Sequence, residues 1–192
     1  ATSREAAEEA LEAAVRQVVA TLGPLVYSTD GRALEYIVGD LLAARGLRIA
    51  VAESCTGGLL TSRLTDVPGS SRYVDRAVVA YSNEAKTALL GVPLPLLAAH
   101  GAVSEAVASA MADGMRTRSG ADVAVAVTGI AGPGGGSPEK PVGTVVVAAV
   151  TAWASHVRTF QFVGERDMVK FQASQAALDL VRRLLSDDPQ GR

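Results

Sequence analysis

The sequence predicts an α/β fold: a three-layer α/β/α arrangement with a mixed, mostly parallel sheet closed by an antiparallel hairpin. Through the middle of the chain, short apolar runs alternate with segments of helical periodicity. Near the end, two long β runs are separated by only a few residues. Hydrophobic residues make up 48% of the 192 residues and aromatic residues only 4%, which suits helices packed closely on a buried sheet.

The first 29 residues are predicted to form an N-terminal helical arm or linker. An amphipathic helix is expected over residues 2–22, with Thr2 and Glu5 spaced as a capping box and an apolar stripe from Leu11 to Leu22. Gly23 and the proline after it end this helix. A second helix is expected from Leu34, with Gly46 as the glycine just past its end.

The remaining elements are predicted to form one domain over residues 30–186, with a frayed tail over 187–192. Strands are expected at residues 47–52, 76–82 and 122–129. Helices are expected at 59–64, 83–90 and 104–117, with a short proline-rich turn of helix before Gly101. After a glycine- and proline-rich loop, the two β runs pair as a hairpin, and a last helix covers 167–185.

Composition excludes several classes of function. The formal net charge is −2 and no run of Lys and Arg occurs, so direct nucleic-acid binding is not expected. Cys55 is the only cysteine, and His100 and His156 lie far apart, so neither a disulfide nor a metal site is expected, and no cofactor. Without a signal peptide or a membrane span, we expect a soluble cytoplasmic protein.

Polar clusters follow three predicted strands, at the point where each strand ends. They are "ESCTGG" (53–58), "YSNEAK" (81–86) and "TGIAGPGGGSPEK" (128–140). In open α/β sheets, ligands bind at the carboxyl ends of the strands. One site assembled from the three clusters is therefore expected.

The first cluster contains a candidate nucleophile, Ser54. It precedes a helix N-terminus, where free N–H groups and the helix dipole favour an anion or a developing oxyanion. Thr56, Gly57 and Gly58 are candidate donors to that anion. The same residues also suit an ordinary helix cap, and the spacing does not decide between the two. Cys55 is a second possible nucleophile, although a small buried apolar side chain is its commoner role.

The second cluster contains a candidate base, Lys86. Ser82 or Asn83 is expected to cap the following helix, which places Lys86 in the first turn, where a lysine gains nothing from the helix dipole. A desolvated lysine can activate a serine in place of histidine. The alternative is a solvated surface lysine.

The third cluster is typical of a loop that binds a phosphate or a sugar. Consecutive glycines, Gly134, Gly135 and Gly136, expose backbone N–H groups that can surround an oxyanion, and Ser137 follows them. An ordinary flexible surface loop is the alternative. Neither the dinucleotide-binding nor the P-loop glycine pattern is present.

Together with "LTDVPGSS", "NEAKTALLGVP", "HGAVSEAVA" and "VAVTGIAGPGGGSPEKPVGTV", these clusters resemble the CinA C-terminal-domain family. The resemblance covers roughly residues 34–185. The stretch "LVYSTDGRALEYIVGDLL" also resembles the segment that joins this domain to the N-terminal half of full-length CinA. We therefore expect either a stand-alone member with an arm or a fragment that starts in the linker.

The resemblance implies a nicotinamide-nucleotide amidase, which hydrolyses nicotinamide mononucleotide to nicotinate mononucleotide and ammonia in pyridine-nucleotide salvage. It implies Ser54 as nucleophile, Lys86 as base and Tyr81 as a hydrogen-bonding partner that holds the site. The substrate-binding residues expected from the clusters and the resemblance together are Thr56, Gly57, Gly58, Asn83, Thr128, Gly129, Gly134, Gly135, Gly136, Ser137 and Arg166.

One position departs from the family pattern. Members commonly carry Gly-Asp-Arg near the last helix and a second Arg one turn later, whereas this chain has "GERDMVK", with Arg166 kept and Lys170 in the second place. A lysine cannot form the bidentate contact of a guanidinium. The runner-up hypothesis is a non-catalytic nucleotide-binding or protein-interaction module. The apolar stripe of the arm favours a homodimer.

Overall fold

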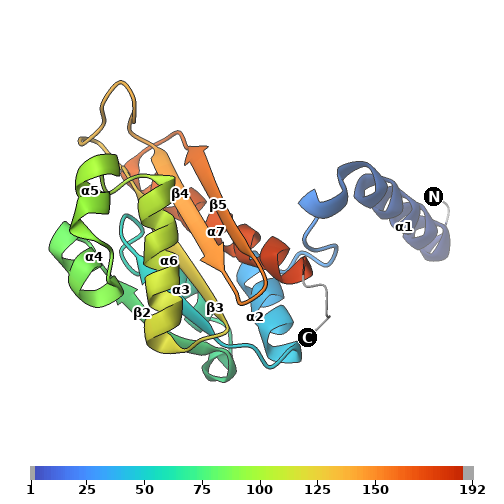
Figure 1. Ribbon diagram of the computed structural model, residues 1–192. Coiled ribbons are helices and arrows are strands. Elements are labelled where there is room, and N and C mark those ends of the chain that lie inside the picture. The colour runs from blue at the N-terminus through green and yellow to red at the C-terminus, as the bar shows by residue number, and fades with distance from the viewer. Residues whose placement is uncertain (1–2, 188–192) are drawn as a thin grey trace.

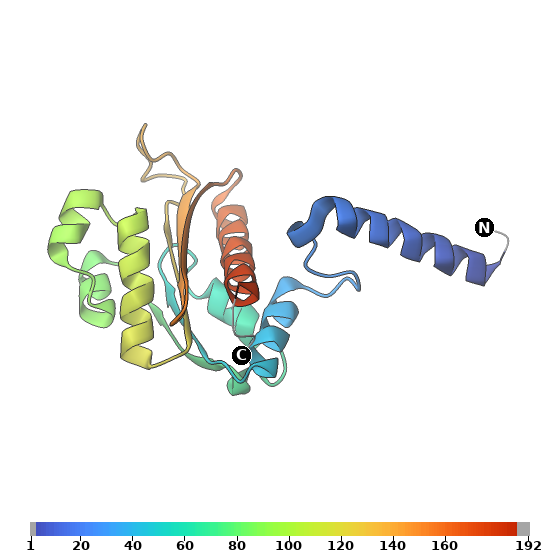
Figure 2. The same ribbon diagram turned by 45° about the vertical axis from the view of Figure 1, so that its right-hand side comes forward.

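The computed structural model describes residues 3–187, and it has the three-layer α/β/α fold that the sequence predicts (Figures 1 and 2). Strands β1 (Ile49–Glu53), β2 (Val74–Val79), β3 (Val123–Gly129), β4 (Thr144–Val150) and β5 (Ser155–Gln161) form the middle layer. Helices α2 (Leu34–Ala44), α3 (Leu59–Thr65) and α7 (Arg166–Ser186) cover one face. Helices α4 (Asn83–Leu90), α5 (Leu94–His100) and α6 (Glu105–Ser119) cover the other.

The sheet is mixed, with strand order β2-β1-β3-β4-β5. Strand β1 pairs in parallel with β2 and β3, while β4 pairs antiparallel with β3 and β5. Four of the five strands therefore run the same way. The predicted hairpin is β4 and β5; it completes one side of the sheet, which stays open with β2 and β5 as its edges.

Along the central strands, larger apolar side chains and alanines alternate, so the two faces of the sheet carry side chains of different size. Ile49, Val51 and Val125 face the layer of α2, α3 and α7, whereas Ala50 and Ala124 face α6. Small residues on the second face let α6 approach the sheet closely. As a result, β1 and β3 are buried on both faces and hold the polar residues at their ends in place.

Apart from shifts of one or two residues at the ends of elements, the structure differs from the predicted elements at two places. Ser3 caps helix α1 (Arg4–Leu22), accepting from the Ala6 amide at 3.2 Å; the predicted capping residue, Thr2, lies outside the described residues, as does the tail beyond Asp187. Strand β2 ends at Val79, earlier than predicted. The Ala80 amide still donates to the Glu53 carbonyl of β1 at 2.8 Å, and the carbonyls of Ala80 and Tyr81 then accept from Lys86 Nζ.

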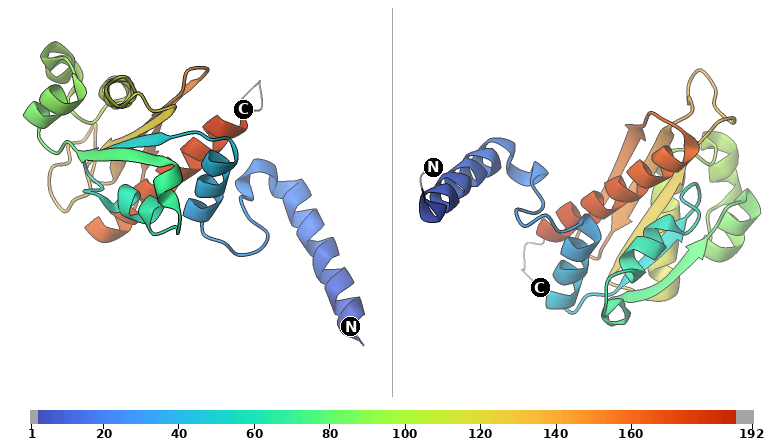
Figure 3. Two further views of the ribbon diagram at one scale, coloured as in Figure 1. Left: turned by 90° about the horizontal axis from the view of Figure 1, so that it is seen from below. Right: turned by 180° about the vertical axis from the view of Figure 1, so that it is seen from behind.

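The arm is the one part of the described chain without a core of its own. No residue of α1 is buried, and the helix projects away from the domain in every view, joined to it by the short helix η1 (Gly23–Leu25) (Figures 1, 2 and 3). Among residues 3–187, no helix has the length and hydropathy needed to cross a membrane.

Candidate active site at the carboxyl ends of the strands

The turn between β1 and α3 is organised by the carboxylate of Glu53, which is fully buried. It accepts hydrogen bonds from the amides of Gly58 (2.9 Å), Leu60 (3.2 Å) and Thr61 (2.9 Å), and from the Thr61 hydroxyl. These donors belong to the N-terminus of α3, so the protein's own carboxylate fills the place where an external phosphate could bind. An anion cradle at this helix end is therefore ruled out.

The same turn presents Ser54 to the side chain of Lys86. The Ser54 amide donates to the Val127 carbonyl at 2.9 Å, which ties the serine to β3. Lys86 Nζ lies 3.1 Å from Ser54 Oγ, and the two side chains are almost completely buried. Gly57 and Gly58 both have positive φ, of 62° and 99°, which lets the chain reverse tightly after the serine.

Lys86 is a buried lysine surrounded by neutral groups. Its Nζ donates to the carbonyls of Ala80 (2.9 Å) and Tyr81 (3.0 Å), and no carboxylate pairs with it within the described residues. Burial lowers the pKa of Lys86 from the ordinary value of 10.5, because a desolvated ammonium is costly. A neutral amine has two N–H donors for the two carbonyls, and its lone pair then faces Ser54 Oγ.

The neighbouring Cys55 is not a competing nucleophile. Its side chain is 4% exposed, and burial raises the pKa of the thiol to about 12. Its sulfur lies 3.0 Å from the position that a Cβ would take on Gly129, where Val145 and the Thr144 carbonyl are equally close. Cys55 therefore packs against the end of β3, and only glycine fits opposite it.

Two amides in the turn remain available for an oxyanion. The Gly57 amide donates to the Ser54 carbonyl at 3.1 Å, and the Gly58 amide to Glu53, so neither is free. Within residues 3–187, no other residue accepts from the amides of Cys55 and Thr56. The N–H that directly follows a nucleophile is a usual oxyanion donor. These two amides, rather than those of the glycines, are the candidates.

A cavity of about 210 Å³ opens beside the turn. It is lined by Cys55, Tyr81, Gly129, Ile130, Ala131, Gly132, Gly134, Gly135 and Arg166. Arg166 closes one side of it, since its guanidinium donates to the Gly132 carbonyl at 2.7 Å and to the Tyr81 hydroxyl at 2.9 Å. One side chain from α7 thus links the segment after β2 to the glycine-rich loop after β3.

A second hollow of about 550 Å³ is also lined by Arg166. Its lining residues are Leu59, Glu165, Arg166, Asp167 and Lys170. Lys170 Nζ also lies 3.8 Å from the position of a Cβ on Gly57, so the lysine that departs from the family pattern reaches the Ser54 turn. Two cations and two carboxylates therefore border this hollow.

The other predicted site residues are either buried near the site or exposed away from the cavity. The Thr56 hydroxyl is fully buried and, within the described chain, has no hydrogen-bond partner. The Thr128 hydroxyl is also buried, and it donates to the Ala102 carbonyl at 2.9 Å. Gly136, Asn83 and Ser137 are exposed and do not line the cavity, and the Ser137 hydroxyl donates to Glu139. Substrate contacts by these residues stay predictions.

Sequence reasoning gave no role to Glu53. Of the three candidate oxyanion donors that it named, the amides of Gly57 and Gly58 are used within the turn, and that of Thr56 stays a candidate. The sequence feature that could have identified Glu53 is its position. It is an acidic residue at the end of an apolar strand, shortly before the N-terminus of a helix. In the residues that the structure describes, no cluster of three or more His, Cys, Asp or Glu side chains is arranged to hold a metal ion.

Comparison with known proteins identifies the family. The sequence profile of the CinA C-terminal domain matches residues 31–185. The chain belongs to the CinA family. It is 48% identical over 187 residues to a CinA-like protein of Desulfotalea psychrophila, and 52% identical over 187 residues to a putative competence-damage inducible protein of Symbiobacterium thermophilum.

The match to these CinA relatives covers most of this chain but less than half of theirs. The alignments span 97% and 91% of this chain, and 45% and 42% of the two relatives. Among solved structures, the competence/damage inducible protein from Agrobacterium tumefaciens superposes with a TM-score of 0.78 at 41% identity, covering 80% of this chain and 94% of that one. The α/β fold is thus shared by CinA-family structures.

Proposed function

We propose that this CinA-family domain is an amidohydrolase that converts nicotinamide mononucleotide to nicotinate mononucleotide and ammonia. The observation that carries the proposal is the buried contact of 3.1 Å between Lys86 Nζ and Ser54 Oγ at the end of β1. A lysine kept away from water and from carboxylates is suited to take a proton from a serine.

The reaction follows from this contact in two halves. Ser54 Oγ attacks the carboxamide carbon as its proton moves to Lys86, and the amides of Cys55 and Thr56 stabilise the oxyanion. Lys86 then gives the proton to the departing nitrogen, and ammonia leaves an ester on Ser54. Water attacks this ester with Lys86 again as base, which releases the carboxylate and restores the serine.

The rest of the mononucleotide is assigned to the glycine-rich loop and to the basic residues at the start of α7. The cavity of about 210 Å³ beside Cys55 suits the nicotinamide ring, with Tyr81 on its wall. Arg166 borders both this cavity and the larger hollow. A phosphate bound there would meet Arg166 and Lys170, the two cations of that hollow, as the proposed substrate needs.

The test is ammonia release from nicotinamide mononucleotide by the purified protein and by Ser54→Ala. We expect turnover by the unmodified protein, unchanged by EDTA, and none above background by Ser54→Ala. The matched control is Ser62→Ala, which removes an exposed hydroxyl from α3 and keeps full activity. Binding of the mononucleotide without ammonia release by the folded, unmodified protein would instead support a non-catalytic module.

A further inference from the structure

A single side chain, Lys86, is placed to move protons to and from the nucleophile. Its Nζ lies 3.1 Å from Ser54 Oγ and donates to the carbonyls of Ala80 and Tyr81. Within residues 3–187, no other side chain forms a hydrogen bond with Ser54 Oγ or with Lys86 Nζ. In the proposed reaction, the group that protonates the departing ammonia is therefore also the one that deprotonates the attacking water.

The nearest carboxylate, Glu53, is not free to act as a second base. Each of its oxygens accepts two hydrogen bonds, one oxygen from the amides of Gly58 and Leu60 and the other from the amide and hydroxyl of Thr61. These four donors occupy the lone pairs of a carboxylate that is fully buried. Glu53 therefore shapes the turn and does not take a proton from water.

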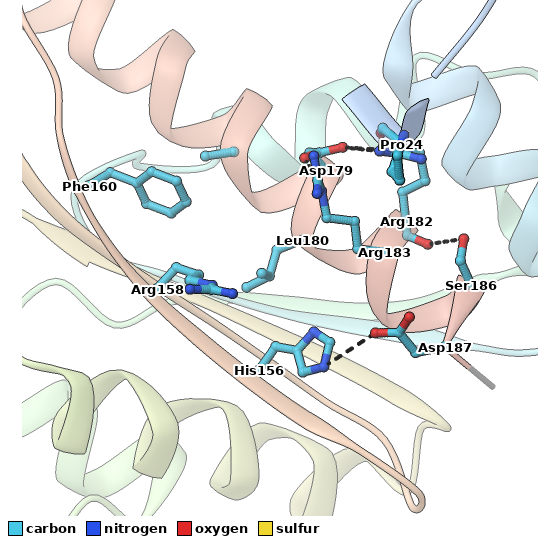
Figure 4. Close-up of a pocket in the computed structure, with 11 residues that line it drawn as sticks. Pro24, His156, Arg158, Phe160, Asp179, Leu180, Arg182, Arg183, Ser186 and Asp187 are labelled. Atoms are coloured by element: carbon cyan, nitrogen blue, oxygen red, sulfur yellow. Dashed lines mark hydrogen bonds and ion pairs between the residues drawn. The ribbon is translucent and has the colours of Figure 1, made fainter. Parts of the chain in front are cut away.

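The two histidines also lie outside the site. His156 pairs with Ala149, which pairs with Val125 near the start of β3, so it lies toward the edge of the sheet opposite the strand ends. There it borders a hollow of about 510 Å³ between β5 and the end of α7, and its Nε2 faces Asp187 at 3.5 Å (Figure 4). His100 ends α5 and does not line the cavity beside the nucleophile. Neither histidine is placed to select water for the second half of the reaction.

Water and ammonia must then use the same position beside Lys86. A group that serves as acid for the leaving nitrogen and as base for the entering nucleophile requires both to pass within its hydrogen-bonding reach. Because no second base reserves this position for water, the choice between water and another nucleophile depends on size and charge. Any small uncharged molecule that resembles ammonia meets both conditions.

We propose that the domain is also an acyltransferase, which passes the acyl group held on Ser54 to small uncharged nitrogen nucleophiles. This inference rests on the proposed function, since it uses the same ester. With hydroxylamine as acceptor, its nitrogen attacks the ester carbon and a proton passes from that nitrogen to Lys86. The bond from carbon to Ser54 Oγ breaks as Lys86 returns the proton to this oxygen. Nicotinamide mononucleotide and hydroxylamine thus give the hydroxamate of nicotinate mononucleotide and ammonia.

The burial of the site limits which acceptors can enter. Ser54 is 7% exposed and Lys86 is 1% exposed, and the cavity of about 210 Å³ beside them is assigned to the nicotinamide ring. A charged ammonium would lose its hydration there, and within the described chain no carboxylate pairs with Lys86 to compensate. Hydroxylamine is small and mostly uncharged at neutral pH. O-benzylhydroxylamine is also uncharged but carries a ring for which this position has no space.

Product analysis by mass spectrometry tests the transfer at neutral pH. With nicotinamide mononucleotide and increasing hydroxylamine, we expect the ratio of hydroxamate to nicotinate mononucleotide to rise in proportion to the hydroxylamine concentration. The benzyl derivative should give at least about 10-fold less transfer product, because a well-filled site does not accept added bulk. Ser54→Ala measures the reaction that occurs without the enzyme. Ser62→Ala, which removes an exposed hydroxyl, should give the product ratio of the unmodified protein, and circular dichroism checks both folds.

The possible outcomes separate this inference from the proposed function. Hydrolysis that gives only nicotinate mononucleotide at every hydroxylamine concentration overturns the transfer and leaves the amidohydrolase standing. Equal yields from hydroxylamine and its benzyl derivative overturn the shared small position. If the folded, unmodified protein consumes no nicotinamide mononucleotide, with or without hydroxylamine, both the proposed function and the transfer are wrong.

Discussion

The turn after β1 and the loop after β3 are both rich in glycine and lie at the same edge of the sheet. They differ in whether their backbone N–H groups are already used within the chain. In the first, Glu53 accepts from the amides at the start of α3, so these amides hold the turn around Ser54 and cannot bind an external anion. The second loop is held by Arg166 and lines a cavity. A glycine-rich turn before a helix is thus no anion site when a buried carboxylate of the chain fills it.

The largest expected effect belongs to Lys86. Lys86→Met removes the base and leaves no buried charge, and turnover of nicotinamide mononucleotide should fall about 1000-fold, within the range for loss of a general base. Lys86→Arg keeps a cation that cannot give up its proton. If steady-state assays show the arginine variant to be as active as the unmodified protein, Lys86 acts only through its charge.

Glu53→Gln tests whether the first turn is held by its carboxylate. The amide nitrogen of Gln cannot accept from the α3 amides, so at least one buried donor loses its partner, which costs about 1–3 kcal/mol of stability. We expect a lower melting temperature and a lower kcat with little change in KM. Asp113→Asn, which neutralises an exposed carboxylate on α6, is the control, and an unchanged kcat in Glu53→Gln would count against the positioning role.

The role proposed for Arg166, which holds the loop after β3, predicts an effect on KM. Arg166→Ala should raise KM about 10- to 100-fold and change kcat less, since a hydrogen bond to a charged group contributes about 1.5–3 kcal/mol. Lys170→Arg, which restores the family residue, should lower KM. A large loss of kcat in Arg166→Ala at unchanged KM would place the arginine in the chemistry instead.

The pH dependence follows from the lowered pKa of Lys86. The reaction needs the neutral amine, so kcat/KM should rise with pH through this pKa and level off below the ordinary value of 10.5. Between the two values the unfolded chain binds a proton that the folded chain does not, so stability also rises with pH in that window. In Lys86→Met, the free energy of unfolding, measured with urea at several pH values, should lack this part of the rise.

The smallest effect is expected at Cys55. Its thiol is buried and protonated at neutral pH, so Cys55→Ala should keep kcat within about 2-fold and lose only packing stability, roughly 1 kcal/mol for a small cavity. Steady-state kinetics and thermal unfolding measure the two effects. A loss of activity as large as that of Lys86→Met would mean that the thiol takes part in the reaction.

The sequence predicted the fold from local rules, whereas the pairing of Ser54 with Lys86 was predicted from strand-end clusters together with the family resemblance. Strand-end clusters converge in any open parallel sheet, and Ser54 and Lys86 each lie near the end of such a strand. It did not predict how the N–H groups of the turn are used, since Glu53 at the end of an apolar run has the same pattern whether it is buried or solvated. The Arg166 contact to Tyr81, 85 positions away, depends on tertiary packing that no local pattern encodes.

Mass spectrometry of the protein quenched in acid during the first turnover tests the central claim most directly. With nicotinamide mononucleotide, we predict a nicotinate-mononucleotide ester on the peptide that contains Ser54, absent from the Ser54→Ala protein, which also releases no ammonia. A label on Cys55, or undiminished ammonia release by Ser54→Ala, would contradict the assignment of Ser54 as the nucleophile.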